Sequence, residues 1–155
     1  MLDTYLSWQA ANRNTIVAAE KKFQFTLNGR NVKGYIDRIE QTPEGEYVVV
    51  DFKTGLKPSS LTKNSVPGDI QLNLYSLAIK ELFGKLPRRA SFYYIQDNKM
   101  VDYFPTEETV GLFAETARAI IAGVCAERFD PTPGYQTCRN CDYADLCGMK
   151  EAGEE

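Results

Sequence analysis

The sequence predicts an α/β protein with a mixed β-sheet flanked by helices. Three strand-like runs, separated by two turn signals, occupy the first third of the chain and indicate an antiparallel meander. A segment with helical periodicity follows, then a second pair of strand-like runs, then a long helical segment. Strands followed by a helix, more strands and another helix are typical of a mixed sheet with helices packed on it.

The turn and cap signals place the boundaries of these elements. Asn28-Gly29 is a strong two-residue hairpin signal, and Pro43-Glu44-Gly45 is a second turn. Asp69 is expected to cap a helix that Gly84 and Pro87 end. In order, we expect a helix at 2–14, strands at 23–27, 32–41 and 46–53, a flexible connection at 57–68, a helix at 70–82, strands at 89–96 and 100–104, and a helix at 106–128.

The two longer helices have apolar stripes that predict which side is buried. On the first, the expected buried face consists of Ile70, Leu74, Leu77, Ala78 and Leu82. On the second, it consists of Val110, Phe113, Ala117, Ile120 and Val124.

The composition limits the class of protein and the kinds of catalytic site that the chain can form. The chain has 155 residues, 43% of them hydrophobic and 25% charged, which suits one globular domain with a real core. No apolar run is long enough to cross a bilayer and the first residues do not resemble a signal peptide, so we expect a cytoplasmic protein without membrane contact. The absence of histidine excludes histidine-zinc sites and histidine general bases. A catalytic metal would need oxygen ligands, which favours Mg²⁺ or Mn²⁺.

Two carboxylates and an ammonium group are predicted to meet on the meander. Alternation places Asp37 on one face of the second strand, together with Tyr35 and Ile39. The same rule puts Val49, Asp51 and Lys53 on one face of the third strand. Antiparallel pairing would then bring Asp37 close to Asp51. A purely structural Asp51–Lys53 ion pair, with Asp37 solvated in a turn, explains the spacing equally well.

Longer motifs favour a catalytic site. Gly34-Tyr-Ile-Asp37-Arg-Ile39, Val50-Asp-Phe-Lys-Thr-Gly55, Gln71-Leu-Asn-Leu-Tyr75 and the terminal cysteines together resemble the PD-(D/E)XK nucleases, in particular the RecB/AddB-like branch. The resemblance covers nearly the whole chain and implies a restriction-endonuclease-like sheet, an antiparallel meander plus further strands. It also implies DNA, single-stranded or unwound, as the substrate.

The resemblance assigns roles to individual residues. Asp37, Asp51 and the backbone carbonyl of Phe52 are implied as ligands of Mg²⁺ or Mn²⁺. Lys53 is implied to position or activate the attacking water and to stabilise the transition state. Glu20 lies where the family often has a glutamate, although a surface glutamate is an equally good interpretation.

Gln71 and Tyr75 are four residues apart and therefore share one helix face. By resemblance they border the active site and the DNA path. The alternative is that they flank the core of an amphipathic helix.

The cysteines form a separate cluster in the sequence. Cys138, Cys141 and Cys147 have the spacing C-x₂-C-x₅-C, and a zinc or iron–sulfur centre needs four ligands. Cys125 is an alternative fourth ligand, but we expect it to be a small buried residue of the last helix. In iron–sulfur members of the RecB/AddB-like branch, the fourth ligand of a [4Fe–4S] cluster is an upstream cysteine, which this sequence lacks, as it lacks an upstream histidine ligand. We therefore expect the C-terminal part of a larger protein, or else a natural short form.

These features lead to an expected division and function. Residues 1–135 are expected to form a nuclease core, and residues 136–155 a cysteine-rich segment and tail. The leading hypothesis is a metal-dependent DNA exonuclease domain of a helicase–nuclease or stand-alone exonuclease in recombination and repair. The alternatives are a catalytically impaired module that binds DNA or a helicase partner, and a small metal-stabilised interaction domain in which the acidic cluster is incidental.

Overall fold

The structure, a computed structural model, describes residues 2–62 and 64–149. Its internal contacts divide the chain into two compact units, Met1–Ala119 and Ile120–Glu155. The first unit contains the whole sheet, and the second contains all four cysteines. This division reflects contacts within the chain. The predicted boundary between residues 135 and 136 separates a nuclease core from a cysteine-rich segment, and it stays a prediction.

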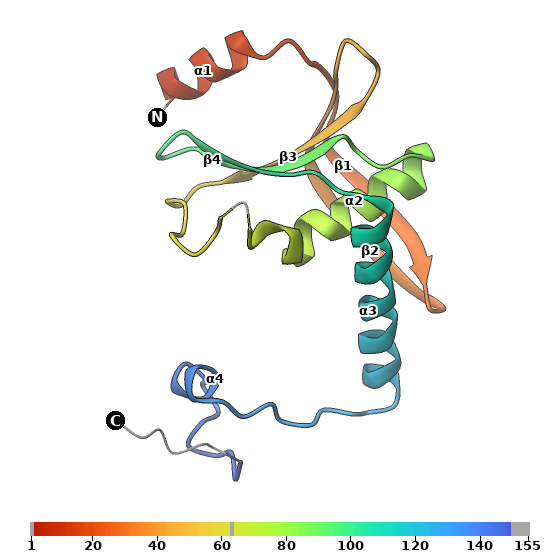
Figure 1. Cartoon of the computed structure of the whole chain (residues 1–155), viewed down its shortest axis with the longest axis vertical. Helices are drawn as coiled ribbons and strands as arrows, with labels where there is room; N and C mark the ends of the chain where they lie inside the picture. Colours follow the sequence, from red (N-terminus) through yellow and green to blue (C-terminus); the bar gives the residue numbers. More distant parts are fainter. Residues whose placement is uncertain (1, 63, 150–155) are drawn as a thin grey trace. The chain divides into compact units, whose positions relative to one another are not determined.

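The first unit is built on one five-stranded mixed sheet with the strand order β1-β2-β3-β4-β5. Its strands are β1 (Thr15–Leu27), β2 (Arg30–Gln41), β3 (Tyr47–Lys53), β4 (Arg89–Tyr94) and β5 (Lys99–Tyr103). All neighbours are antiparallel except β3 and β4, which are parallel (Figure 1). The predicted meander and mixed sheet are therefore confirmed.

The predicted turns are also present. Asn28 and Gly29 both have positive φ values, 50° and 72°, which is the backbone that a tight two-residue hairpin requires. In the second turn the Gly45 amide donates to the Thr42 carbonyl at 2.9 Å. β1 begins eight residues earlier than expected, at Thr15, because pairing with β2 continues to Gln41 and needs no apolar alternation.

Helix α2 (Ile70–Phe83) follows a short 3₁₀ turn, η1 (Val66–Gly68). Asp69 caps it by accepting a hydrogen bond from the Leu72 amide at 2.9 Å, and Gly84 ends it with φ 75°, so both predicted caps are confirmed. The predicted buried face was wrong at two positions, since Ile70 is 70% exposed and Leu82 38% exposed. The buried face instead contains Leu72, Asn73, Tyr75, Ser76, Leu77, Ala78 and Ile79.

Two layers of side chains cover the two faces of the sheet. Val49 packs in the cluster on the α2 face, whereas Val48 and Val50 pack on the other face with Tyr93. Helix α1 (Leu2–Ala11) closes that second face with Tyr5 and Trp8, and Figure 1 shows α1 and α2 on opposite sides of the strands. The central strand β3 is thus buried on both faces, which holds its last residues in place.

Helix α3 (Glu107–Cys125) buries only Val110 and Ala114, which pack with Leu77 of α2. The predicted inward positions in its last turns were wrong, because Ile120 is 60% exposed and Val124 53% exposed. Apolar periodicity showed a stripe but could not show where packing partners end.

The second unit contains the end of α3 and a short helix, α4 (Tyr135–Arg139). Cys125 is exposed there, so its predicted burial was wrong. Among the helices of the described residues, none is both long enough and apolar enough to span a membrane.

Candidate active site

The site begins where β2 and β3 separate. The two strands pair from Gln41↔Tyr47 to Arg38↔Val50, and no further pair follows. One residue beyond the last pair, the Asp37 carboxylate accepts a hydrogen bond from the Phe52 amide at 2.9 Å. A side-chain oxygen thus takes the place of a strand partner, which satisfies the amide and fixes the carboxylate beside the end of β3.

Asp51 and Lys53 form an ion pair at the end of β3. Nζ of Lys53 lies 2.6 Å from Oδ2 of Asp51, whose side chain is only 4% exposed. The same ammonium group lies 4.7 Å from the centre of the Phe92 ring. Phe92 is a contact that the sequence did not predict, since it depends on the parallel pairing Asp51↔Phe92 between β3 and β4.

Helix α2 supplies two further polar side chains. Gln71 donates to Oδ1 of Asp51 at 2.8 Å and to the Tyr75 hydroxyl at 2.7 Å, and it accepts from Nζ of Lys53 at 2.8 Å. The Tyr75 hydroxyl donates to Oδ1 of Asp51 at 3.3 Å. These contacts connect Asp51, Lys53, Gln71 and Tyr75 into one network, and Asp37 reaches it through the backbone of Phe52.

Burial controls the electrostatics of this network. Burial raises the pKa of Asp51, the Lys53 ammonium opposes that rise, and the charge of Asp37 adds to it. Burial also raises the pKa of Tyr75 to about 12, so its hydroxyl keeps its proton at neutral pH and remains a donor.

The oxygen atoms of the site suit a hard divalent cation. Oδ2 of Asp51 is buried and accepts no hydrogen bond from an aligned donor; Lys53 contacts it as an ion pair. A buried carboxylate oxygen with unused lone pairs, next to a second carboxylate, fits Mg²⁺ or Mn²⁺. Within residues 2–62 and 64–149, however, no three His, Cys, Asp or Glu side chains are grouped to hold a metal ion. The two aspartates would therefore need backbone or water ligands as well.

Glu20 lies on β1 opposite Asp37, because Ala19 pairs with Arg38 and Lys21 pairs with Ile36. Its side chain is exposed, and its backbone has φ 49°, a left-handed conformation that is uncommon for glutamate. In the described part of the chain, no hydrogen bond or ion pair links Glu20 to Asp51 or Lys53. The structure thus brings Glu20 to the right level of the sheet without a contact to the network.

The alternation used to group residues on β2 is interrupted at this level. Ile36 and Ile39 are three residues apart, yet both belong to the core cluster on the α2 face. Strict alternation would place them on opposite faces. Tyr35, which is 56% exposed, therefore cannot be assigned to the face of Ile39 as the sequence suggested.

The cysteines lie in the second unit and are all free thiols. The Cys141 amide donates to the Cys138 carbonyl at 3.3 Å, so these two residues share a turn. None of the metal-ligand groupings expected from their spacing is formed among the described residues. As arranged here, Cys138, Cys141 and Cys147 do not make a binding site for a cluster.

A five-stranded mixed sheet flanked by helices, with two aspartates and a lysine where β2 and β3 separate, has the restriction-endonuclease-like fold. The chain belongs to the PD-(D/E)XK nuclease superfamily, whose family model matches residues 1–148.

Two solved structures share this fold. The structure of SSO0001 has a TM-score of 0.51 at 16% identity, covering 97% of this chain and 68% of that one. A candidate exonuclease from Eubacterium rectale has a TM-score of 0.50 at 14% identity, covering 89% of this chain and 55% of that one. At such identities the likeness shows the fold alone.

Two relatives from bacteriophages are closer in sequence. The Gene 69 protein of Mycobacterium phage D29 is 30% identical over 136 residues, which are 84% of this chain and 47% of that protein. The Gene 69 protein of Mycobacterium phage L5 is 29% identical over 136 residues, 84% of this chain and 44% of that protein. The chain thus spans about half the length of these curated relatives.

Proposed function

We propose that the chain is the catalytic domain of a metal-dependent DNA exonuclease. The observation that carries the proposal is the network in which Gln71 contacts both Asp51 and Lys53, with Asp37 fixed beside them by the Phe52 amide. A purely structural Asp51–Lys53 ion pair would need neither the Asp37 carboxylate nor its hydrogen bond from the Phe52 amide. Membership of a nuclease superfamily supports the same chemistry.

The proposed roles are those that the family resemblance implies. Asp37, Asp51 and the Phe52 carbonyl would hold Mg²⁺ or Mn²⁺, which when bound supplies Lewis-acid chemistry at a phosphoryl oxygen. Lys53 holds its ammonium group beside Asp51, where it can orient the attacking water and stabilise negative charge on the phosphate. Gln71 contacts both Lys53 and Asp51 and so fixes the directions of their side chains. Glu20 would assist from β1, where the register places it opposite Asp37.

The wider context belongs to the same proposal. The motif spacing favours a RecB/AddB-like nuclease that acts on single-stranded or unwound DNA in recombination and repair, with a helicase domain or subunit as partner. The length of the two phage relatives supports a larger parent protein.

A [4Fe–4S] cluster on Cys138, Cys141 and Cys147 would need a fourth ligand and a rearrangement of these thiols. Anaerobic purification followed by iron and sulfide analysis tests this part. If the purified chain contains neither iron nor sulfide in stoichiometric amount, it does not bind a [4Fe–4S] cluster and this part of the proposal is refuted.

Hydrolysis of labelled single-stranded DNA in Mg²⁺ or Mn²⁺ tests the enzyme. We expect Asp51→Asn and Lys53→Ala each to lower the rate by roughly 100-fold or more, the usual cost of removing one transition-state contact. Asp130→Ala, an exposed carboxylate of the second unit, is the matched control and should keep the rate of the unmodified chain. Equal rates for Asp51→Asn and Asp130→Ala would refute the proposal.

One observation favours a second candidate, a nuclease-like module that binds DNA without cleaving it. Only two carboxylates meet at the site among the described residues. Such a module would bind single-stranded DNA in EDTA and show no cleavage in Mn²⁺, whereas the enzyme would show both.

A further inference from the structure

The outer part of the β1–β2 hairpin, residues 21–36, is basic, in contrast to the rest of the chain. Residues 21–36 contain four cations, Lys21, Lys22, Arg30 and Lys33, and no Asp or Glu. Because the whole chain has a formal net charge of −3, the remaining residues carry −7. None of the four cations takes part in an ion pair among the described residues, and all four are exposed. Their charge is therefore free to attract an anionic ligand.

The strand register collects part of this charge around an aromatic ring. Lys22 pairs with Tyr35, and Gln24 pairs with Lys33. Directly opposite residues project from the same face, so Lys22, Lys33 and Tyr35 lie together on one surface of the hairpin. Phe23 and Phe25 alternate with them and pack into the core, which fixes this orientation. Tyr35 is 56% exposed, so its side chain is accessible to a ligand.

Two residues of this surface, Lys33 and Tyr35, also line a hollow that reaches Gln71 and Tyr75 of the site. Beyond Arg38↔Val50 the edge of β2 has no β3 partner, and a cavity of about 630 Å³ lies between this edge and the start of α2. Its lining includes Lys33, Gly34 and Tyr35 from β2 and Gln71 and Tyr75 from α2. A volume of this size accommodates a small ligand such as one nucleotide. Gln71 and Tyr75 both donate hydrogen bonds to Asp51, so a ligand in the hollow would lie next to the side chains that hold this carboxylate.

We propose that Lys22, Lys33 and Tyr35 form a binding subsite for single-stranded nucleic acid that leads into the Asp37–Asp51 site. The two ammonium groups bind phosphates, and the Tyr35 ring stacks on a base. Alternation of cations with an exposed aromatic ring fits a single strand, because the bases of a duplex are already stacked on one another. The inference rests on the proposed nuclease function for its substrate, but it concerns binding and not cleavage.

Binding measured without metal tests the subsite separately from catalysis. The probe is a short fluorescein-labelled oligodeoxythymidine, titrated in EDTA and followed by anisotropy at several salt concentrations. We expect Lys22→Glu/Lys33→Glu to weaken binding at least tenfold and to reduce the slope of log K against log salt by about 1.4, because each single-strand phosphate contact contributes about 0.7. We expect Tyr35→Ala to weaken binding about tenfold at an unchanged slope, and Tyr35→Trp to restore it.

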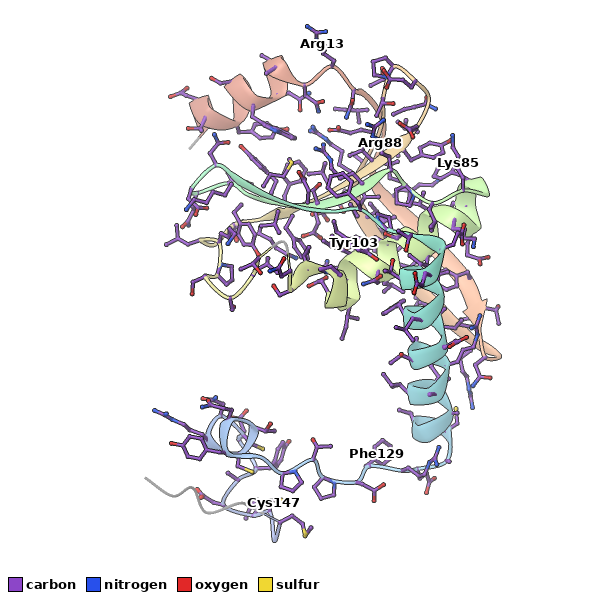
Figure 2. The ribbon with its side chains drawn as sticks, viewed as in Figure 1. Arg13, Lys85, Arg88, Tyr103, Phe129 and Cys147 are labelled. Carbon is purple, nitrogen blue, oxygen red and sulfur yellow. The ribbon has the colours of Figure 1, made fainter. Side chains whose placement is uncertain are left out.

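The matched control is Arg13→Glu/Lys85→Glu, which brings the net charge to the same −7. Arg13 lies just before β1. The first residue of that strand, Thr15, is about 23 Å from Lys22 at the usual rise per residue. Lys85 donates to the Gly45 carbonyl, in the turn at the other end of β2 from Lys33. Figure 2 shows Arg13 just after α1 and Lys85 just after α2.

The outcomes separate the two proposals. Equal weakening by the two double variants, or no effect of Tyr35→Ala, would overturn the subsite. A labelled duplex that binds as tightly as the single strand would overturn it as well. Selective loss of binding in a chain that never cleaves DNA in Mn²⁺ would support the subsite and refute the nuclease.

Discussion

At the scale of single residues, Asp51 experiences two opposing influences. Its side chain is buried at the end of β3, which raises its pKa, and the Lys53 ammonium only partly offsets this effect. The charged carboxylate is thus held in a place that disfavours it. A buried charge lowers the stability of the protein without a cation, but it favours the binding of one. Such a trade-off between stability and function is common.

Asp51→Asn should therefore make the protein more stable while abolishing the proposed cleavage. The side-chain oxygen of asparagine can still accept from Gln71 and Tyr75. Its NH₂ group would face the Lys53 ammonium, whose side chain is 33% exposed and can turn toward water. We expect the free energy of unfolding at neutral pH to rise by an amount within the roughly 0.5–2 kcal/mol that single stabilising substitutions give.

The pH dependence of this gain has a definite sign. Since the folded pKa of Asp51 lies above the ordinary aspartate value of 3.8, the folded state binds more protons than the unfolded state between those two values. The stability of the unmodified protein therefore decreases as the pH rises through that window. The advantage of Asp51→Asn in thermal denaturation should be full at neutral pH and shrink as the pH falls toward 3.8. An advantage that grows on acidification would contradict this account.

At the scale of elements, the contact between β1 and β2 depends on a glycine. A Cβ on Gly34 would lie 2.7 Å from Cζ of Phe23, and the Phe23 ring is 2% exposed. That ring stacks on Phe25 and meets Tyr75 edge to face, so it has little room to move. The glycine thus lets β1 supply core packing directly behind the Gln71–Tyr75 side of the site.

Gly34→Ala should destabilise the protein by about 1–3 kcal/mol in chemical denaturation, the usual cost of overpacking. Gly111→Ala is the control: a methyl group on this exposed helical glycine would meet nothing within 4 Å, and the substitution should stabilise by about 0.5–1 kcal/mol. In a Phe23→Leu background the cost of Gly34→Ala should shrink, because the two positions are coupled. An equal cost in both backgrounds would place the strain elsewhere.

The elements also show which features the sequence could predict. The Asn28-Gly29 hairpin and the Asp69 and Gly84 caps are local, so a few neighbouring residues determine them. The approach of Asp37 to the end of β3 followed from antiparallel pairing across a short turn.

Features that depend on distant contacts were not predictable. Phe92 reaches Lys53 only through the parallel β3–β4 pairing. The exposure of Ile70 and Leu82 depends on which neighbours pack against α2, and apolar periodicity does not report this. The left-handed backbone of Glu20 had no sequence signal of the kind that glycine or asparagine gives.

At the scale of the whole molecule, two kinds of potential metal ligand belong to different units of the chain. The carboxylates belong to the unit Met1–Ala119 and the cysteines to Ile120–Glu155. Hard oxygen ligands and soft thiolates select different ions. Substitutions in each unit can therefore assign a bound ion to one of the two sets.

Adding Mn²⁺ should raise the melting temperature of the protein if the proposed carboxylate site binds it. At a free concentration about 100 times the Kd, linkage stabilises by about 2.7 kcal/mol, or about 5–10 °C for a chain of this size. Asp51→Asn should lose this shift, whereas Asp130→Ala and the triple variant Cys138→Ser/Cys141→Ser/Cys147→Ser should keep it. A shift that survives Asp51→Asn but disappears in the triple variant would move the ion to the cysteines and leave Asp51 and Lys53 as a structural pair.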